Sequence, residues 1–329
     1  MTMTIEHTAA PAVPADIIES FALPDALPEQ LSGGLVNQTY RIGDFILQRL
    51  GHTTDHRSVN DGVAVMQYMT ARGWQVPCPL AGSNGEYAQA DTAGNLWRAS
   101  SFVESDNVVP DYLDQSGLYR SGQLLGRWHR DLANSNIELQ AATDNVHDTA
   151  MHAGRLACLY ADLPDDTTKR AADTLLSRYD SLPSLPDTPQ QLIHGDPKLA
   201  NMLFQDSQPF TLIDYDTLMH GSPWLDVGDM LRSIASCDIR AGQNTELGRL
   251  HTALQGYTET VENASDRDIL QTTGLAATKI IATELAIRYL NDIVTEDYFS
   301  WDSSRAGSRQ EHHMGRIAVH LQITDAIQI

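Results

Sequence analysis

Short hydrophobic runs, separated by turn-forming residues, characterise the first part of the chain. The runs are apolar or alternate with polar positions, which is typical of strands, and they cover residues 32–42, 45–49, 75–81, 86–89 and 96–103. One longer helix interrupts them, because Val59, Val63 and Met69 recur at helical spacing before Gly73. A shorter helix is expected at residues 15–21. This pattern predicts a small antiparallel sheet with one main helix.

The pattern changes from strands to helices after residues 106–111. Periodic apolar positions predict helices at 112–133, 151–160, 165–178, 247–262, 269–294 and 308–327. The most apolar helical stretch, near 275–287, is too short to span a bilayer and contains Lys279 and Glu284. The chain is therefore expected to be α+β, with a strand-rich part at 1–104 and a mainly helical part at 105–329.

A polar loop within the helical part stands out. Residues 191–193 are a short apolar lead-in, and His194, Asp196, Lys198 and Asn201 follow it. Two strand-like runs come next, at 201–204 and 210–213, with a turn expected at 206–209. Because the two strands of a hairpin run back to the same end, the polar loop and Asp214 are expected to lie together.

Those side chains suit phosphoryl transfer. A carboxylate (Asp196) can accept the proton of a substrate hydroxyl, while an amide (Asn201) and a second carboxylate (Asp214) can hold Mg²⁺ on nucleotide phosphates. Lys198 can offset the charge of the transferred phosphoryl group. The alternative is a polar surface turn whose Asp and Asn residues cap a helix. The number of matching positions and their strand context favour the catalytic interpretation.

The motif His-x-Asp-x-Lys-x-x-Asn, followed by Ile213-Asp214, resembles the catalytic and metal loops of the aminoglycoside and choline kinase type of phosphotransferase. That resemblance implies a bilobal protein-kinase-like fold that uses ATP and Mg²⁺. It also implies that residues 1–104 form a nucleotide-binding lobe and residues 105–329 a catalytic and substrate-binding lobe.

The same resemblance implies where the nucleotide binds. A glycine-bearing hairpin would approach the phosphates, the connector between the lobes would contact adenine, and a residue after the catalytic loop would contact the nucleotide: Gly33 and Gly34, then Phe102, Val103 and Glu104, then Leu203. The strand lysine that usually binds the phosphates is missing, since no lysine precedes Lys169. Gln48 or Arg49 takes its place, and strand alternation puts Gln48 on the face of Ile46 and Arg49 on the opposite face.

A closer resemblance extends over residues 33 to about 300. The stretches that carry it, which look like the N-acetylhexosamine 1-kinase family, include Gly34-Leu-Val-Asn-Gln-Thr-Tyr40, Leu96-Trp-Arg98, Val146-His-Asp-Thr149 and Arg288-Tyr-Leu-Asn-Asp292. That family phosphorylates the anomeric hydroxyl of N-acetylglucosamine or N-acetylgalactosamine, so Arg288 and Tyr298 become candidate sugar-binding residues. The alternative for Arg288 is an ion pair with Asp292 on the same helix.

Asp226 and His129 are expected to support the polar loop and the helices around it. Asp226 resembles the buried aspartate that braces the catalytic loop of kinase folds by accepting backbone N–H bonds, a role compatible with a carboxylate in the first turn of a helix. His129 is expected to be a packed helix histidine rather than a catalytic group.

The charge and the cysteine content of the chain limit which binding partners and which cell compartment are expected. The formal net charge is −21, which argues against nucleic acid or an anionic membrane as a partner. An acidic surface could attract a cationic substrate or serve solubility alone. The three cysteines are far apart and no secretory signal precedes residue 20, so a reducing cytoplasm is expected. The oligomeric state is left open.

The sequence is also compatible with two other functions. An aminoglycoside, choline or amino-alcohol phosphotransferase would keep the fold and change the acceptor. A non-catalytic kinase-fold binding protein would explain the missing strand lysine, but the intact set of Asp196, Asn201 and Asp214 argues against it.

Overall fold

The N-terminal strands pair into one antiparallel sheet of six strands in the order β1-β2-β3-β6-β4, with β5 pairing to β6. The computed structural model describes residues 13–31, 37–51, 54–106, 112–141, 146–244, 246–261, 267–301 and 303–328. The strands of this sheet are β1 (Glu29–Leu31), β2 (Gln38–Ile42), β3 (Phe45–Arg49), β4 (Pro79–Leu80), β5 (Ala88–Ala90) and β6 (Leu96–Ser101). The strand expected at 75–81 is short because Pro77 and Pro79 have no N–H to donate to a ladder.

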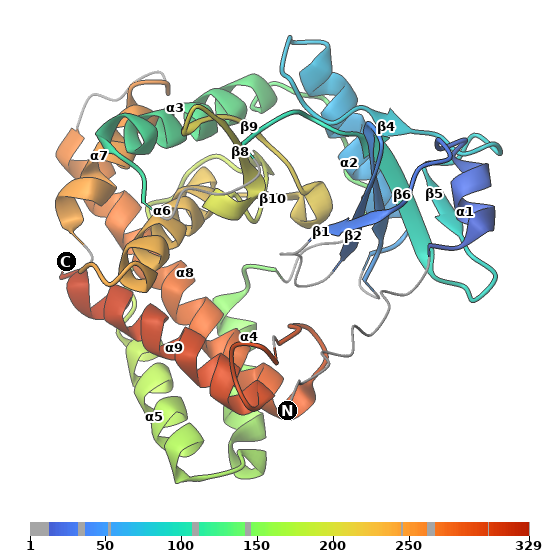
Figure 1. Cartoon of the computed structure of the whole chain (residues 1–329). Helices are drawn as coiled ribbons and strands as arrows, with labels where there is room; N and C mark the ends of the chain where they lie inside the picture. The colour runs from blue at the N-terminus through green and yellow to red at the C-terminus, as the bar shows by residue number, and fades with distance from the viewer. Residues whose placement is uncertain are drawn as a thin grey trace, which may run out of the picture.

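Two helices cover the two faces of this sheet (Figure 1). Helix α1 (Ala15–Ser20) packs on the face of Tyr40, Leu47 and Trp97. Helix α2 (His56–Thr70) packs on the face that includes Leu96, and its N-terminus is capped by the side chain of Asp55. The face under α2 is the one that turns toward the rest of the molecule.

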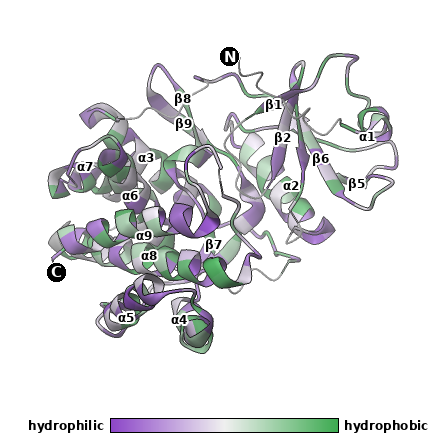
Figure 2. Ribbon diagram, turned by 60° about the horizontal axis from the view of Figure 1, so that its bottom comes forward, coloured by the Kyte–Doolittle hydropathy of each residue, from purple (hydrophilic) through white to green (hydrophobic). Residues whose placement is uncertain are grey.

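The remainder is helical apart from two small ladders (Figure 1). The helices are α3 (Gln115–Leu132), α4 (Thr149–Leu159), α5 (Asp166–Asp180), α6 (Pro223–Arg240), α7 (Leu247–Thr258), α8 (Arg267–Thr295) and α9 (Arg309–Ala326). Hydrophilic and hydrophobic residues alternate along them (Figure 2), as expected for helices that are buried on one side. The largest core cluster joins α3, α6 and α7 to the β8–β9 hairpin and includes Leu125, Trp128 and Phe204.

Helices α3 and α7 approach each other closely. A Cβ atom on Gly122 would lie 1.8 Å from the carbonyl oxygen of Ala253, and one on Gly256 would lie 1.9 Å from that of Tyr119. These glycines let the backbones of α3 and α7 come into contact, which fixes the position of α3 against α7.

The segment that contains the polar loop, residues 191–214, lies on two ladders. Strand β7 (Gln191–Ile193) leads into the polar loop, and the hairpin of β8 (Met202–Gln205) and β9 (Gln208–Leu212) follows it. The expected turn at 206–209 is shorter, because Asp206 and Ser207 both take positive φ angles (52° and 60°) and close the hairpin alone. Sequence analysis missed β10 (Met219–Gly221), which pairs with β7.

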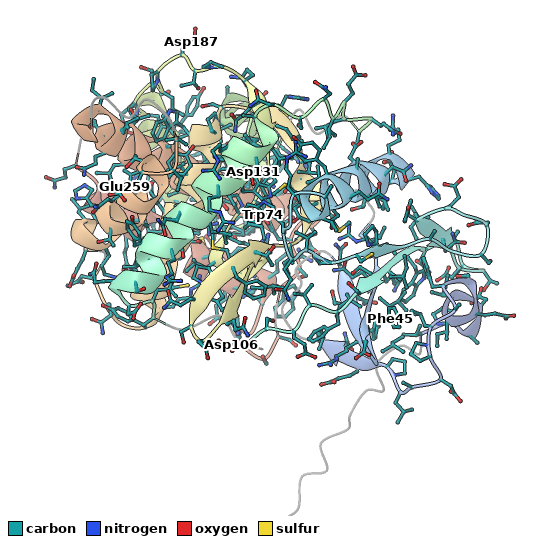
Figure 3. The ribbon with its side chains drawn as sticks, turned by 90° about the horizontal axis from the view of Figure 1, so that it is seen from above. Phe45, Trp74, Asp106, Asp131, Asp187 and Glu259 are labelled. Carbon is teal, nitrogen blue, oxygen red and sulfur yellow. The ribbon has the colours of Figure 1, made fainter. Side chains whose placement is uncertain are left out.

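The sheet and the helical part are joined at several points. Trp74 Nε1 donates to Asp131 Oδ2 at 2.8 Å, so the end of α2 is tied to α3; the two residues lie side by side in Figure 3. The carboxylate of Asp61 on α2 accepts from the backbone N–H groups of Gln140 and Ala141. After β6, the N–H of Asp106 donates to the carbonyl of Phe204 at 2.7 Å.

These features make the chain an α+β protein, with a strand-rich N-terminal region and a helical C-terminal part. No helix in the described ranges is long and apolar enough to cross a membrane.

Candidate active site

The loop after β7 is held in a fixed shape by one buried carboxylate. Asp226, in the first turn of α6, accepts from the N–H groups of His194 and Gly195 at 2.8 Å each and is fully buried. Burial raises the pKa of Asp226, but the hydrogen bond from His129 and other neighbours outweigh it and hold the pKa below its usual range. The prediction that Asp226 braces the loop is confirmed.

Position 195 in this loop requires glycine. Its φ is +79°, and a Cβ atom there would lie 2.2 Å from the carbonyl oxygen of Thr217. His129, expected to be a packed histidine, is buried and bonds through its ring nitrogens to Tyr257 and Asp226. The loop is therefore supported from below by α3, α6 and α7.

Asp196, Lys198 and Asn201 converge. Lys198 Nζ lies 2.5 Å from Asp196 Oδ2, and Asn201 Nδ2 donates to the same oxygen at 3.0 Å and to the backbone carbonyl of Asp196 at 2.7 Å. Burial raises the pKa of Asp196, but Lys198 and Arg232 outweigh it and keep this carboxyl ionised, with a lowered pKa. An ionised carboxylate here can accept a hydrogen bond from a substrate hydroxyl.

The hairpin brings Asp214 to the same end of the site. The N–H of Ile213 donates to the carbonyl of Asn201 at 2.9 Å, which extends the β8–β9 pairing. His194 Nε2 donates to the carbonyl of Ile213 at 3.1 Å. Asp214 itself takes a left-handed conformation (φ 70°), which turns the chain out of β9. The predicted return of the hairpin to the polar loop is confirmed.

Asp214 has one carboxylate oxygen that forms no hydrogen bond within the described residues. Its Oδ1 atom is buried and accepts no hydrogen bond from the described residues. Burial and the neighbouring carboxylate of Asp216 raise the pKa of Asp214 to about 6. A group in this state gains from a nearby cation, because the cation stabilises the charged form.

The donor set here fits a hard divalent cation. Asn201 uses Nδ2 for its hydrogen bonds, which leaves its Oδ1 available, and Asp214 offers a free carboxylate oxygen. Amide and carboxylate oxygens are the ligands that Mg²⁺ takes, with water and phosphate filling its other positions. Within the described ranges no group of three His, Cys, Asp or Glu side chains forms a metal-binding cluster.

The neighbouring sheet presents a second polar group to the site. Gln48 on β3 faces Arg98 on β6 directly in register, and Arg98 Nε donates to Gln48 Oε1 at 2.8 Å. The guanidinium of Arg98 then pairs with Asp216 and lies 3.8 Å from Asp214 Oδ1. Arg49 lies on the opposite face and bonds Asn95 Oδ1 at 2.6 Å. The prediction from strand alternation that Gln48 and Arg49 lie on opposite faces of the sheet is confirmed.

Sequence analysis missed Arg98 and Asp216. Arg98 stood inside the Leu96-Trp-Arg stretch, and Asp216 inside Ile213-Asp-Tyr-Asp. The register of β3 against β6 places Arg98 opposite Gln48, and the packing of the sheet against the segment after β9 brings Asp216 to it. The available signal is strand alternation, which places the cationic side chain of Arg98 on one face of its strand, as it does Gln48 on the neighbouring one.

The predicted nucleotide contacts are spread along the junction. The N–H of Phe102 already donates to the carbonyl of Asp44 at 2.8 Å, whereas Glu104 is exposed. Leu203 is half-buried, while Met202 and Phe204 on either side of it point into the core. Gly33 and Gly34 lie outside the described residues.

The two predicted sugar-binding residues are neighbours. The guanidinium of Arg288 lies 4.9 Å from the centre of the Tyr298 ring. The alternative pairing of Arg288 with Asp292 is wrong, because Asp292 binds His313 and Arg309 instead. Arg288 lies 3.9 Å from Glu284, one turn earlier on α8.

Glu284 connects this region to the catalytic loop. It accepts from His147 Nδ1 at 2.9 Å, and His147 Nε2 donates to the carbonyl of Gly195 at 2.8 Å. Burial lowers the pKa of His147, but Glu284 outweighs it and raises the pKa, so the ring can donate from both nitrogens. The sequence did not indicate this role of His147, which lies in the stretch Val146-His-Asp-Thr149 that carries part of the family resemblance.

Comparisons with known proteins agree with this geometry. A homoserine kinase of Gluconobacter oxydans (strain 621H) is 26% identical over 178 residues, which cover 53% of this chain and 54% of that kinase. The chain thus spans about half the length of this curated relative.

Solved structures share the fold over nearly the whole chain. An amicoumacin kinase in complex with AMP-PNP, Ca²⁺ and its antibiotic matches with a TM-score of 0.66 at 15% identity, covering 94% of this chain and 92% of that one. The GDP and kanamycin complex of APH(2″)-IIIa gives 0.67 at 15% identity, covering 94% and 97%. A microcompartment-associated aminopropanol kinase gives 0.60 at 19% identity, covering 94% of each chain.

The family model described as the phosphotransferase enzyme family (APH) matches residues 28–260, which include the braced loop, the hairpin and the sheet. The chain belongs to this family of small-molecule phosphotransferases.

Proposed function

We propose that this protein transfers the γ-phosphate of ATP to a hydroxyl group of a small molecule. The observation that carries the proposal is the convergence of Asp196, Asn201 and Asp214, in which one carboxylate is ionised and paired and the other has a buried oxygen without a partner. A binding protein without catalysis would have no need of this arrangement.

Each residue has a separate role in the proposed reaction. Asp196 accepts a hydrogen bond from the acceptor hydroxyl and aligns its oxygen with the γ-phosphorus. It takes the hydroxyl proton as the new P–O bond forms and the bond from the γ-phosphorus to the bridging oxygen breaks, which releases ADP. Lys198, whose pKa is raised because Asp196 and Asp214 outweigh the opposing effect of burial, carries a positive charge to the transferred phosphoryl group. Asn201 and Asp214 would hold Mg²⁺, which when bound neutralises charge on the phosphates.

The nucleotide is proposed to lie between a lobe formed by residues 1–104 and one formed by residues 105–329. Since the N–H of Phe102 is occupied by Asp44, adenine contacts from the connector fall to the backbone of Val103 and Glu104. Leu203 would lie against the base, and Gly33, Gly34 and Gln48 near the phosphates. A cytoplasmic location, where ATP is available, is part of the proposal.

For the acceptor we propose a sugar, namely the anomeric hydroxyl of an N-acetylhexosamine. Arg288 and Tyr298 support it, because a guanidinium and a phenol can donate to neighbouring sugar oxygens while the ring covers the apolar face of a pyranose. The chain of contacts from Arg288 through Glu284 and His147 to Gly195 connects this pair to the loop of Asp196.

An amino-alcohol such as homoserine is the second candidate acceptor. The similarity to the Gluconobacter kinase favours it. So does Asp229, whose Oδ2 is buried without a hydrogen-bond partner among the described residues, while its Oδ1 accepts from Arg232. A free carboxylate oxygen of this kind could receive a substrate ammonium.

An ADP-release assay over N-acetylhexosamines, homoserine, choline, aminopropanol and aminoglycosides would separate the candidates. The proposal expects turnover with an N-acetylhexosamine and a ³¹P signal of a sugar 1-phosphate in the product. Turnover of homoserine alone would replace the sugar by the amino-alcohol. A rise in melting temperature with Mg-ATP but no turnover of any acceptor would favour a non-catalytic binding protein.

A further inference from the structure

We propose that Arg98 supplies the positive charge on the nucleotide phosphates that a strand lysine supplies in protein kinases, and that Asp216 holds it in place. In protein kinases that lysine pairs with a glutamate of the lobe's helix. This inference rests on the proposed ATP site and assigns it a residue of the sheet.

The sheet offers one arginine at the right place. Gln48 occupies the strand position where a lysine would stand, and Arg98 is its cross-strand partner on the same face. The hydrogen bond from Arg98 Nε to Gln48 Oε1 directs the guanidinium along this face toward Asp214 and Asp216. Gln48 Nε2 in turn donates to Thr39 Oγ1 at 3.1 Å, so the orienting side chain is itself fixed.

Other arginines of the sheet are engaged elsewhere. Arg49 points to the opposite face, where it bonds Asn95 and Gln38. Arg41 lies over the ring of Phe102 at 3.8 Å and near Glu104, on the connector between the lobes. Among the described arginines of β2, β3 and β6, Arg98 therefore is the one that contacts the loop of Asp214.

Helix α2 provides no carboxylate to hold a sheet cation. Its acidic residue, Asp61, has both oxygens bonded to the backbone of Gln140 and Ala141. Asp216 takes that place from another element, since it binds both Nη atoms of Arg98 and also accepts from Asn37 Nδ2 at 2.7 Å. The segment from Asp214 to Asp216 thus places a candidate metal ligand and the carboxylate that holds the cation only two residues apart.

Arginine suits this position better than lysine. Its planar group has five N–H donors, so it can keep Gln48 and Asp216 and still donate to a phosphate oxygen. The side chain of Arg98 is 15% exposed and that of Asp216 is 16% exposed, so the pair is shielded but not closed off. A triphosphate bound beside Asp214 would meet a cation that is already oriented.

The test compares nucleotide and nucleoside affinities by isothermal titration calorimetry. Arg98→Gln is expected to weaken Mg-ATP binding by roughly 10- to 100-fold, as for the loss of a hydrogen bond to a charged group, and to change adenosine affinity by less than about twofold. Arg98→Lys should recover part of the loss, because it restores the charge without the fork. Arg49→Gln, on the opposite face of the same sheet, is the matched control and should leave both affinities unchanged.

Arg98→Gln leaves Asp216 without its counter-ion and could unfold the site, so the double variant Arg98→Gln/Asp216→Asn restores the local charge balance. It is expected to bind Mg-ATP as weakly as Arg98→Gln alone. Unchanged Mg-ATP affinity in either variant, or an equal loss for adenosine and Mg-ATP, would overturn the role of Arg98. Wild-type protein that binds no Mg-ATP would instead sink the proposed function itself.

Discussion

At the scale of single residues, the two aspartates of the candidate site differ in their pKa and in their hydrogen-bond partners. Asp196 is paired with Lys198 and has a lowered pKa, whereas Asp214 has a raised one and a free oxygen. Two carboxylates in one site with pKa values moved in opposite directions indicate two roles, and the roles we propose are alignment of the acceptor for Asp196 and binding of a cation for Asp214.

Asp196→Asn tests the first of these roles. We expect kcat to fall by roughly 10²- to 10⁴-fold, because the amide neither takes the hydroxyl proton nor aligns it as a carboxylate does. The measurement is ADP release with the acceptor identified in the substrate panel. Asp206→Asn, in the hairpin turn of the same segment, is the control and should keep its activity. A kcat within a factor of two of wild type in Asp196→Asn would remove Asp196 from catalysis.

The pKa of Asp214 makes cation binding dependent on pH. Above about pH 6 the carboxyl is ionised and can bind a divalent cation, and below it a proton competes for the same oxygens. The dissociation constant for Mn²⁺, measured by calorimetry, should therefore rise by about tenfold per unit as the pH falls below 6. Asp214→Asn should weaken binding and remove this dependence. A constant affinity between pH 5 and 7.5 would contradict the assignment.

At the scale of elements, the contact between α3 and α7 depends on glycine. Gly122→Ala would place a methyl group 1.8 Å from Ala253 O and force the helices apart. We expect a loss of about 3 kcal/mol in the free energy of unfolding, seen as a lower melting temperature. In α4, a Cβ atom on Gly154 would meet nothing within 4 Å, so Gly154→Ala should stabilise the protein by about 0.5–1 kcal/mol. Equal effects of the two substitutions would refute the close approach.

Helix α9 contains a histidine that limits stability in acid. His320 Nδ1 donates to the carbonyl of Arg316, and its Nε2 is buried without a hydrogen-bond partner among the described residues. Burial and the charge of Arg232 lower the pKa of His320 to about 3. In the unfolded chain His320 therefore binds a proton near pH 6.5, whereas in the folded chain it stays neutral until about pH 3. Its contribution to the free energy of unfolding is present above pH 6.5 and is lost as the pH falls toward 3.

The slope of this loss is at most ~1.4 kcal/mol per pH unit. His320→Gln, which has no comparable titration, should flatten the decline of the melting temperature between pH 6.5 and 4. His220, which is exposed on β10, is the matched position, and His220→Gln should leave the curve unchanged. A wild-type curve that coincides with that of His320→Gln would show that the histidine is not involved.

The long elements could be predicted from the sequence because each signals its own ends. Helices α2, α3, α5 and α9 begin directly after capping residues, Asp55, Asp114, Asp165 and Ser308 in that order, so their predicted limits lie within a few residues of the observed ones. The hairpin that carries Asn201 and Asp214 was recoverable for the same reason, since strand, turn and strand are contiguous.

What the sequence did not reveal depends on pairing between distant segments. Strand β10 exists because it pairs with β7, and its short, apolar-poor sequence gives no signal of its own. The contact of Arg98 with Asp216 spans 118 positions and joins the sheet to the segment after β9. Likewise His147 reaches Glu284 across 137 positions. Local periodicity carries no information on such contacts.

At the scale of the whole molecule, the two parts meet through apolar packing that includes Val65 and Met69, and through polar contacts close to the candidate site. Arg98 and Asn37 bind Asp216 from the sheet, and Asp106 binds the β8–β9 hairpin through its backbone and side chain. The catalytic loop and the sheet are therefore held by the same short segment. These contacts place Asp216, which lies two residues after Asp214, at the junction of the two parts.

The scarcity of lysine has a practical consequence for detection of this protein. The chain contains Lys169, Lys198 and Lys279 and no other lysine. Acyl-phosphate derivatives of ATP label a kinase when an unprotonated lysine amine beside the phosphates attacks the acyl carbon and displaces the nucleotide. In the proposed site that lysine is Lys198, whose raised pKa keeps it protonated. We expect the intact mass to stay unchanged after treatment with such a probe, so chemoproteomic surveys based on lysine acylation would overlook this phosphotransferase.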